Sequence, residues 1–138
     1  MSDFGYGFET RLRGVGHADA LQRVIKALET EGFGVLTEID VRQTLKKKLD
    51  VEFRPYVILG ACNPPLAKQA LESESQIGLL LPCNVVVQQT GDDEVSVSIA
   101  DPKAMFTLVD NPRVAPVAEE AEARLRRVML ALTPGNSA

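Results

Sequence analysis

Cys62 and Cys83 are the only two cysteines in the 138-residue chain, and each is followed by an asparagine. A thiolate is a nucleophile and a soft ligand, whereas a side-chain amide holds polar groups through hydrogen bonds. Cys62-Asn63 and Cys83-Asn84 are therefore candidates for a redox or nucleophilic site, or for a pocket that binds a ligand. A third interpretation is purely structural, because free cysteine is among the most buried residue types and packs as a small apolar side chain. The sequence leaves these alternatives open.

The first pair stands directly before a predicted helix. Asn63 is a favoured cap and Pro64 is favoured at the first helical position. A thiol at that place faces unpaired N–H groups and the positive end of the helix dipole, which lowers a thiol pKa. Such a site suits a small anionic or electrophilic ligand better than a cation.

Whether the two thiols meet depends on how the chain returns. The apolar run Tyr56–Ala61 predicts a central strand, followed by a helix that ends near Leu71 or Glu72. We interpret Ile77–Leu81 as an extended segment that returns to the same end of the sheet. The strand Val85–Gln89 would then pair antiparallel with the first and place Cys83 beside Cys62. A parallel crossover is the alternative, and it would separate the thiols by a strand length.

Other candidate groups are fewer. Arg42 and Lys46 lie one turn apart on a predicted helix and could both reach an anion, although a solvated helix face is the simpler interpretation. His17, the one histidine, stands at the start of another helix and is expected to be an exposed residue near the cap. Two cysteines and one histidine make an incomplete ligand set, so we predict no metal site, no cofactor and no catalytic residues.

Alternating and helical patterns predict the elements that position these residues. Gly32 fits the left-handed position after a helix, and Asp40 fits a helix cap. The predicted order is β-α-β-(α)-β-(α)-β-β-α: an α+β fold with a mainly antiparallel sheet of about five strands and two long helices on one face. We expect a single domain over residues 1–132 and a disordered tail over 133–138. The predicted strands cover residues 6–12, 33–39, 56–61, 85–89 and 95–99, and the long helices cover 18–28 and 114–129.

Charge and composition limit the classes of function. The net charge is −4, which disfavours general binding to nucleic acid or to a membrane. The first residues lack the basic start and apolar run of a signal peptide, so a cytoplasmic protein with reduced thiols is expected.

Several segments resemble one known family, the bacterial and archaeal domain-of-unknown-function family 302. They are YGF at 6–8, GFGVLTEIDV at 32–41, TLKKKLDVEFRPYVILGACNP at 44–64, GLLLPCNVVV at 78–87 and DP at 101–102. The resemblance implies a compact α+β fold related to that of the TATA-binding protein, and a homodimer. It implies no reaction, and DNA binding does not transfer with a fold.

The resulting expectation is a small homodimeric domain that is not an enzyme and that binds a small molecule or a protein partner. The alternative is a thiol-based redox or sulfur-handling protein that uses Cys62 and Cys83.

Overall fold

Six strands form one antiparallel sheet in the computed structural model, which describes residues 1–133. The strands are β1 (Ser2–Phe4), β2 (Gly7–Arg13), β3 (Gly34–Asp40), β4 (Tyr56–Cys62), β5 (Cys83–Gly91) and β6 (Glu94–Ala100). Their spatial order is β1-β2-β6-β5-β4-β3. The predicted antiparallel α+β fold is confirmed, with six strands instead of five. The additional strand, β1, has only three residues, too few to show an alternating pattern.

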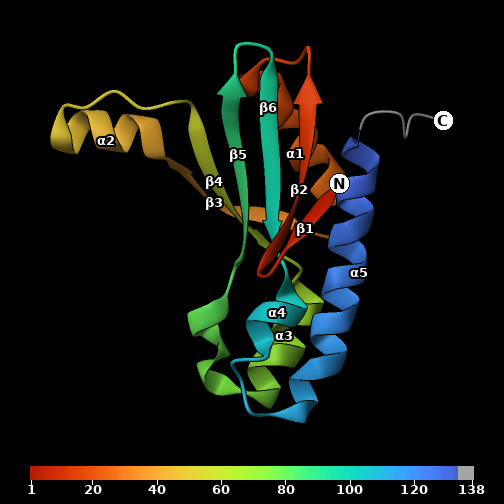
Figure 1. Cartoon of the computed structure of the whole chain (residues 1–138). Helices are drawn as coiled ribbons and strands as arrows, with labels where there is room; N and C mark the ends of the chain where they lie inside the picture. Colours follow the sequence, from red (N-terminus) through yellow and green to blue (C-terminus); the bar gives the residue numbers. More distant parts are fainter. Residues whose placement is uncertain (134–138) are drawn as a thin grey trace.

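Two long helices, α1 (His17–Thr30) and α5 (Ala115–Leu132), cover one face of the sheet, as predicted (Figure 1). The shorter helices are α2 (Val41–Leu49), α3 (Pro64–Ser73) and α4 (Pro102–Phe106), with 3-10 turns η1 (Ser75–Leu80) and η2 (Pro112–Val114). No helix within residues 1–133 combines the length and apolar character needed to cross a bilayer. Thr133 hydrogen-bonds to Met129 and Thr10; the rest of the predicted tail, 134–138, lies outside the described residues.

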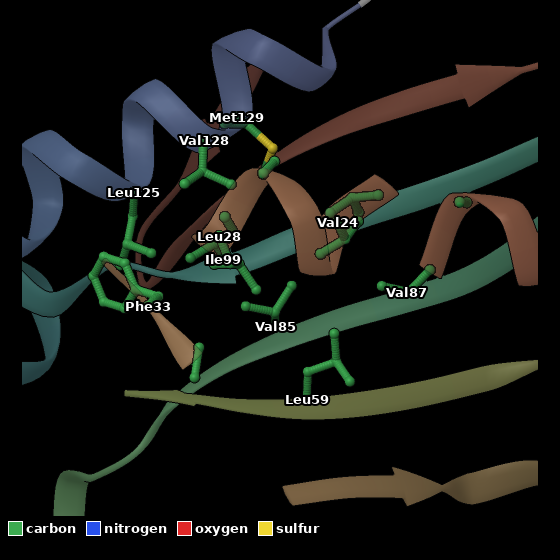
Figure 2. Packing of buried hydrophobic residues seen from close by; sticks show 14 of the residues in the cluster. Val24, Leu28, Phe33, Leu59, Val85, Val87, Ile99, Leu125, Val128 and Met129 are labelled. Atoms are coloured by element: carbon green, nitrogen blue, oxygen red, sulfur yellow. The ribbon is translucent and has the colours of Figure 1, made fainter. Parts of the chain in front are cut away.

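The main hydrophobic core lies between the sheet and these two helices (Figure 2). Every second residue of a strand points to the same face, so Val85 and Val87 of β5 face the helices while their neighbours face the other way. Leu28 of α1 and Leu125 and Met129 of α5 meet them, and all five side chains are fully buried. Burial of this apolar stripe is what fixes the register of the sheet.

A second, smaller core lies beyond the end of the sheet and joins the short helices to the N-terminal half of α5 (Figure 1). Ile77 of η1 and Phe106 of α4 are buried there. The other buried members of this cluster are Ala70, Val114, Val117 and Ala118. Helix α5 therefore packs against both cores.

This second core explains two corrections to the sequence prediction. Residues 77–81 are not an extended run, because residues 75–80 form the 3-10 helix η1, in which the Ile77 N–H donates to the Glu74 carbonyl oxygen. A short apolar run is ambiguous between strand and helix, and burial of Ile77 decides it here. No helix was predicted between residues 99 and 114, but Asp101-Pro102 starts α4, where the Asp101 side chain accepts hydrogen bonds from the Lys103 and Ala104 N–H groups.

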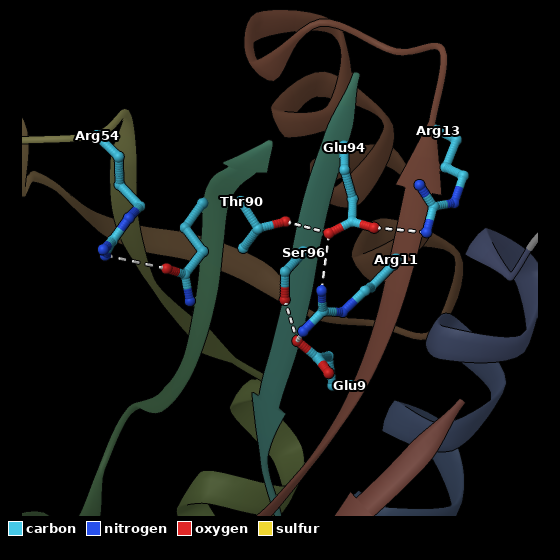
Figure 3. A network of polar contacts seen from close by, with 8 residues as sticks. Glu9, Arg11, Arg13, Arg54, Thr90, Glu94 and Ser96 are labelled. Carbon is cyan, nitrogen blue, oxygen red and sulfur yellow. Dashed lines mark hydrogen bonds and ion pairs between the residues drawn. The ribbon is translucent and has the colours of Figure 1, made fainter. Parts of the chain in front are cut away.

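The opposite face of the sheet carries a polar network at the ends of β2, β5 and β6 (Figure 3). Glu94 forms ion pairs with Arg11 at 2.7 Å and Arg13 at 2.8 Å. Ser96, which is fully buried, donates to Glu9. The Thr90 hydroxyl donates to Glu94, and this hydrogen bond is the largest of the causes that lower the pKa of the Glu94 carboxyl. On this part of the sheet face that the long helices leave uncovered, the charged side chains are paired with one another.

Helix α2 stands apart from the rest of the chain, at the far end of β3 and β4 (Figure 1). Asp40 caps it by accepting from the Gln43 N–H at 2.9 Å, as predicted. None of its residues is buried, and Leu49 is 65% exposed. We call residues 40–54 the α2 arm.

Candidate functional site

A pocket of about 290 Å³ opens where the sheet ends and the second core begins. Its walls come from the ends of β3, β4 and β5, from α3 and η1, and from α4 and α5. Nearly all of the lining side chains are apolar. They are Phe33, Leu36, Ala61, Cys62, Asn63, Leu66, Ala67, Ala70, Leu71, Gly78, Leu81, Pro82, Cys83, Pro102, Phe106, Val117 and Ala121.

Three of the four Cys-Asn residues lie at this pocket. Strands β4 and β5 pair antiparallel, with Ala61 opposite Cys83, so the predicted return to the same end of the sheet is confirmed. Cys62 is one residue further along the adjacent strand, which places its Cα about 6 Å from that of Cys83 by the geometry of paired strands. Both thiols are free, and both line the pocket.

The segment before Cys83 is held by a close contact with a glycine. Pro82 and Thr37 pack directly against Gly60 of β4, where a Cβ atom would overlap both side chains. A residue without a side chain is needed at such a close approach. Gly60 therefore allows the Leu81–Cys83 segment to lie on the sheet and form the pocket wall.

Asn63 joins three helices at the rim of the pocket. Its Oδ1 accepts from the Leu66 N–H at 3.3 Å, which confirms the predicted cap of α3. Its Nδ2 donates at 3.3 Å to the carbonyl oxygen of Glu31, which also accepts from Arg124 of α5 at 3.2 Å. Gly32 follows with a φ of +82°, the predicted left-handed position after α1. Asn63 is thus buried and already hydrogen-bonded at both ends of its amide.

The thiols are less acidic than ordinary cysteine thiols. Burial raises the pKa of Cys62. Burial, and to a smaller extent the neighbouring Cys62, raises the pKa of Cys83 to about 11. The side chains of both residues keep some contact with solvent, but an apolar surrounding disfavours the charged form. The direction is opposite to the lowering of the Cys62 pKa that its place before α3 suggested, and both thiols are protonated at neutral pH.

Asn84, the fourth residue, faces a different hollow. Successive side chains of a strand point to opposite faces, so Asn84 points away from the helix-covered side on which Cys83 lies. It lines a smaller pocket of about 140 Å³ together with Leu79, Leu80, Ala100 and Met105.

Arg42 and Lys46 lie on the α2 arm and do not line the pocket. They share a shallow hollow with Asp40 and Glu52. Lys46 is paired with Asp50 at 2.9 Å and with Glu52 at 3.1 Å. An anion placed there would meet carboxylates that already neutralise the lysine. His17 lies elsewhere as well, with its Nε2 2.9 Å from the carbonyl oxygen of Val87. Within residues 1–133 no three His, Cys, Asp or Glu side chains are grouped to hold a metal ion.

The pocket walls from α4 and α5 were not predicted to be site residues. Phe106 belongs to α4, a helix that was not predicted, and the spacing of Val117 and Ala121 is that of ordinary core positions of α5. The one signal in the sequence is the small size of Ala67, Ala70 and Ala121, because alanines on packed helices leave space between them.

Fold and site together define an α+β domain with an antiparallel sheet, two long helices on one face and an apolar pocket at the end of the sheet. The sequence profile described as "Domain of unknown function DUF302" matches residues 8–132, and the chain belongs to this family. A similar solved structure is the crystal structure of the uncharacterized conserved protein DUF302 from Bacillus stearothermophilus, with 27% identity and a TM-score of 0.83. The match covers 92% of this chain and 98% of that one. No curated protein matches the chain.

Proposed function

We propose that the protein is a binding module for an uncharged, largely apolar small molecule, which occupies the pocket at the end of the sheet. The observation that carries this proposal is the pocket itself, with its apolar walls and the two protonated thiols. Ligand sites are concave and mostly apolar, with few polar groups. If each heavy atom takes roughly the 30 Å³ that a water molecule occupies in the liquid, the pocket holds a molecule of about ten heavy atoms.

A neutral ligand fits this pocket better than the anionic ligand suggested by the sequence. No arginine, lysine or histidine lines the pocket in the described part of the chain. The amide of Asn63 is engaged with Leu66 and Glu31. A buried anion without a partner is strongly unfavourable, whereas an apolar molecule gains by leaving water.

The thiol-based alternative uses the same two cysteines and makes a different demand. A reactive cysteine has a lowered pKa and a positive surrounding. Here burial raises the pKa of both thiols, and this favours a role as pocket lining over a role in redox or sulfur chemistry.

Pocket occupancy can be tested with a variant that fills it. Ala67 of α3 lines the pocket, whereas Gln69 on the same helix does not. Binding of propylbenzene, a neutral molecule of nine carbon atoms, should be measurable by calorimetry and should be lost in Ala67→Trp. The control Gln69→Trp should bind as the native protein does. Absence of binding to the native protein, or equal binding by Ala67→Trp, would overturn the proposal.

The redox alternative is tested by alkylation with iodoacetamide across pH. We expect neither thiol to react at neutral pH faster than a cysteine in an unstructured peptide, and Cys83 to react more slowly than Cys62. Fast modification of either thiol at pH 6 would favour the alternative instead.

We also propose that the protein is a homodimer in which the α2 arm of one copy packs against the second copy. Leu49 and Val51 of the arm, and Ile39 just before it, are exposed apolar side chains that belong to neither core of their own chain. Helix α2 itself carries only positive charges, although the chain as a whole has a net charge of −4. The remainder of a second copy is therefore acidic and complements helix α2.

Light scattering at micromolar concentration tests this assembly. We expect the mass of a dimer for the native chain. We expect the mass of a monomer for Leu49→Glu, which places a charge among the exposed apolar side chains of the arm, called here the exposed stripe. Lys47→Glu, on the same helix but off that stripe, separates loss of apolar contact from loss of charge attraction, since only the latter depends on salt. A monomeric native protein would overturn the proposal.

A further inference from the structure

The smaller pocket adjoins the larger one along a shared wall. Leu81, Pro82 and Cys83 line both, and so do Pro102 and Phe106 at the start and end of α4. The two pockets are therefore neighbours, and the segment 81–83 and α4 contribute to the walls of both. Of the two, the smaller pocket is the one that Asn84 lines, and the Asn84 side chain points away from the helix-covered side of the sheet.

The two pockets differ in what they offer a ligand. In the smaller one, Asn84 is exposed and its side chain has no hydrogen bond with any of residues 1–133. Its carboxamide has both a donor and an acceptor group. Asn63, the corresponding residue of the first Cys-Asn pair, is buried, and its amide is hydrogen-bonded to the Leu66 N–H of α3 and to the Glu31 carbonyl oxygen. The two asparagines thus have different roles, one in the architecture and one free at the surface of a pocket.

The smaller pocket also lacks charge. Apart from Asn84 and Cys83, its lining consists of Leu79, Leu80, Leu81, Pro82, Ala100, Pro102, Met105 and Phe106. No ionised side chain is present in that lining to balance a carboxylate, a phosphate or an ammonium group. A polar group placed there can be recognised only through hydrogen bonds, and the side chain available for them is that of Asn84.

We propose that the ligand is a neutral amphipathic molecule: a hydrocarbon body in the larger pocket and one uncharged hydrogen-bonding head, such as a hydroxyl, ketone or amide, beside Asn84 in the smaller pocket. This inference rests on the proposed function, since it names the class of molecule that the same site takes. Burial of the apolar surface of the body stabilises the complex. The head selects among molecules of similar size, because a group that makes one hydrogen bond is preferred over one that makes none.

The experiment compares three probes by calorimetry on the native protein and two variants at pH 7. The probes are propylbenzene, which has a body and no head; 1-octanol, which has both; and octanoate, whose head is charged. Asn84→Ala removes the carboxamide at a solvent-exposed position, so the variant should fold. Gln88→Ala is the matched control, because Gln88 lies on the same face of β5 but lines neither pocket.

We expect 1-octanol to bind the native protein and Gln88→Ala equally, and to bind Asn84→Ala about three- to tenfold more weakly, the range of one hydrogen bond. Propylbenzene should bind all three proteins alike, and octanoate should bind at least about tenfold more weakly than 1-octanol. An Asn84→Ala variant that binds 1-octanol as tightly as the native protein overturns the inference, and so does octanoate binding as tightly as 1-octanol. Both results leave the proposed function standing if propylbenzene binds, whereas failure of every probe overturns the proposed function itself.

Discussion

The Cys83 thiol links the pocket to the stability of the fold. Its pKa is about 11 in the folded protein and near 9.0 for an ordinary thiol. Between these values the unfolded chain releases a proton that the folded chain keeps, so stability is fully present below pH 9 and falls as the pH rises toward 11. A difference of this size corresponds to about 2–3 kcal/mol at most.

Urea unfolding at pH 8 and pH 10.5 measures this effect. The native protein should lose more stability over the interval than Cys83→Ala, in which every other titrating group is retained. Equal losses in the two proteins would show that Cys83 ionises as easily in the fold as in the unfolded chain.

Gly32 is the second residue with a specific demand. Its φ is +82°, and a Cβ atom would lie 3.0 Å from Nδ2 of Asn63. Gly32→Ala should therefore destabilise the protein by more than about 1 kcal/mol, through backbone strain and through displacement of Asn63. The control is Gly34→Ala, where φ is not positive and an added Cβ meets no atom within 4 Å. Thermal unfolding of both variants checks this, and equal melting temperatures would contradict it.

At this scale the sequence predicted what depends on near neighbours in the chain. Gly32 and Asn63 were identified because a helix end and a helix cap are local events. The raised thiol pKa values were not predicted, because they come from burial, and the pocket around the thiols includes walls from α4 and α5, which begin 19 or more residues after Cys83. The hydrogen bond from Asn63 to Glu31, across 32 residues, was likewise outside the reach of a local pattern.

Helices α2 and α3 offer a comparison of two caps with the same local chemistry. Asp40 and Asn63 each accept a hydrogen bond from the N–H three residues on. Loss of a cap costs about 1 kcal/mol, and Asn63→Ala also removes the donor to Glu31. We expect Asn63→Ala to lower the free energy of global unfolding by about 1–3 kcal/mol. Asp40→Ala should have little effect on it, because α2 contributes no buried residue to either core.

Urea unfolding followed by circular dichroism gives the global value for both variants, and hydrogen exchange of the α2 amides reports the local one. Faster exchange confined to α2 is expected for Asp40→Ala. A global loss in Asp40→Ala as large as that in Asn63→Ala would mean that the arm supports the fold.

Elements with strong periodicity were predicted and those set by tertiary contact were not. The alternating strands and the long helices α1 and α5 follow from their patterns. The 3-10 helix η1 does not, because the apolar residues 77–81 fit a strand equally well until Ile77 finds the second core. Helix α4 could have been found: Asp101-Pro102 is the same kind of start signal as Asn63-Pro64, which was read correctly.

Across the whole molecule, the two cores should differ in stability. The main hydrophobic core, between the sheet and the two long helices, contains many more buried residues than the second, smaller core. Leu125→Ala, in the larger core, should lower the global free energy of unfolding by about 2–5 kcal/mol. Phe106→Ala, in the smaller core, should mainly increase hydrogen exchange in α3 and η1 while the amides of β5 and β6 stay protected. Equal loss of protection in the strands of both variants would show that the chain unfolds as one unit.

The α2 arm gives the chain a place where it can be cut without losing its fold. Three consecutive lysines, Lys46 to Lys48, stand on a helix that no core holds in place, so a protease that cleaves after lysine meets a segment that opens locally at small cost. The two fragments would stay joined through the pairing of β3 with β4. If a second copy covers the arm, dilution of the sample would speed the cut. New termini or an inserted tag would be tolerated in the same exposed helix.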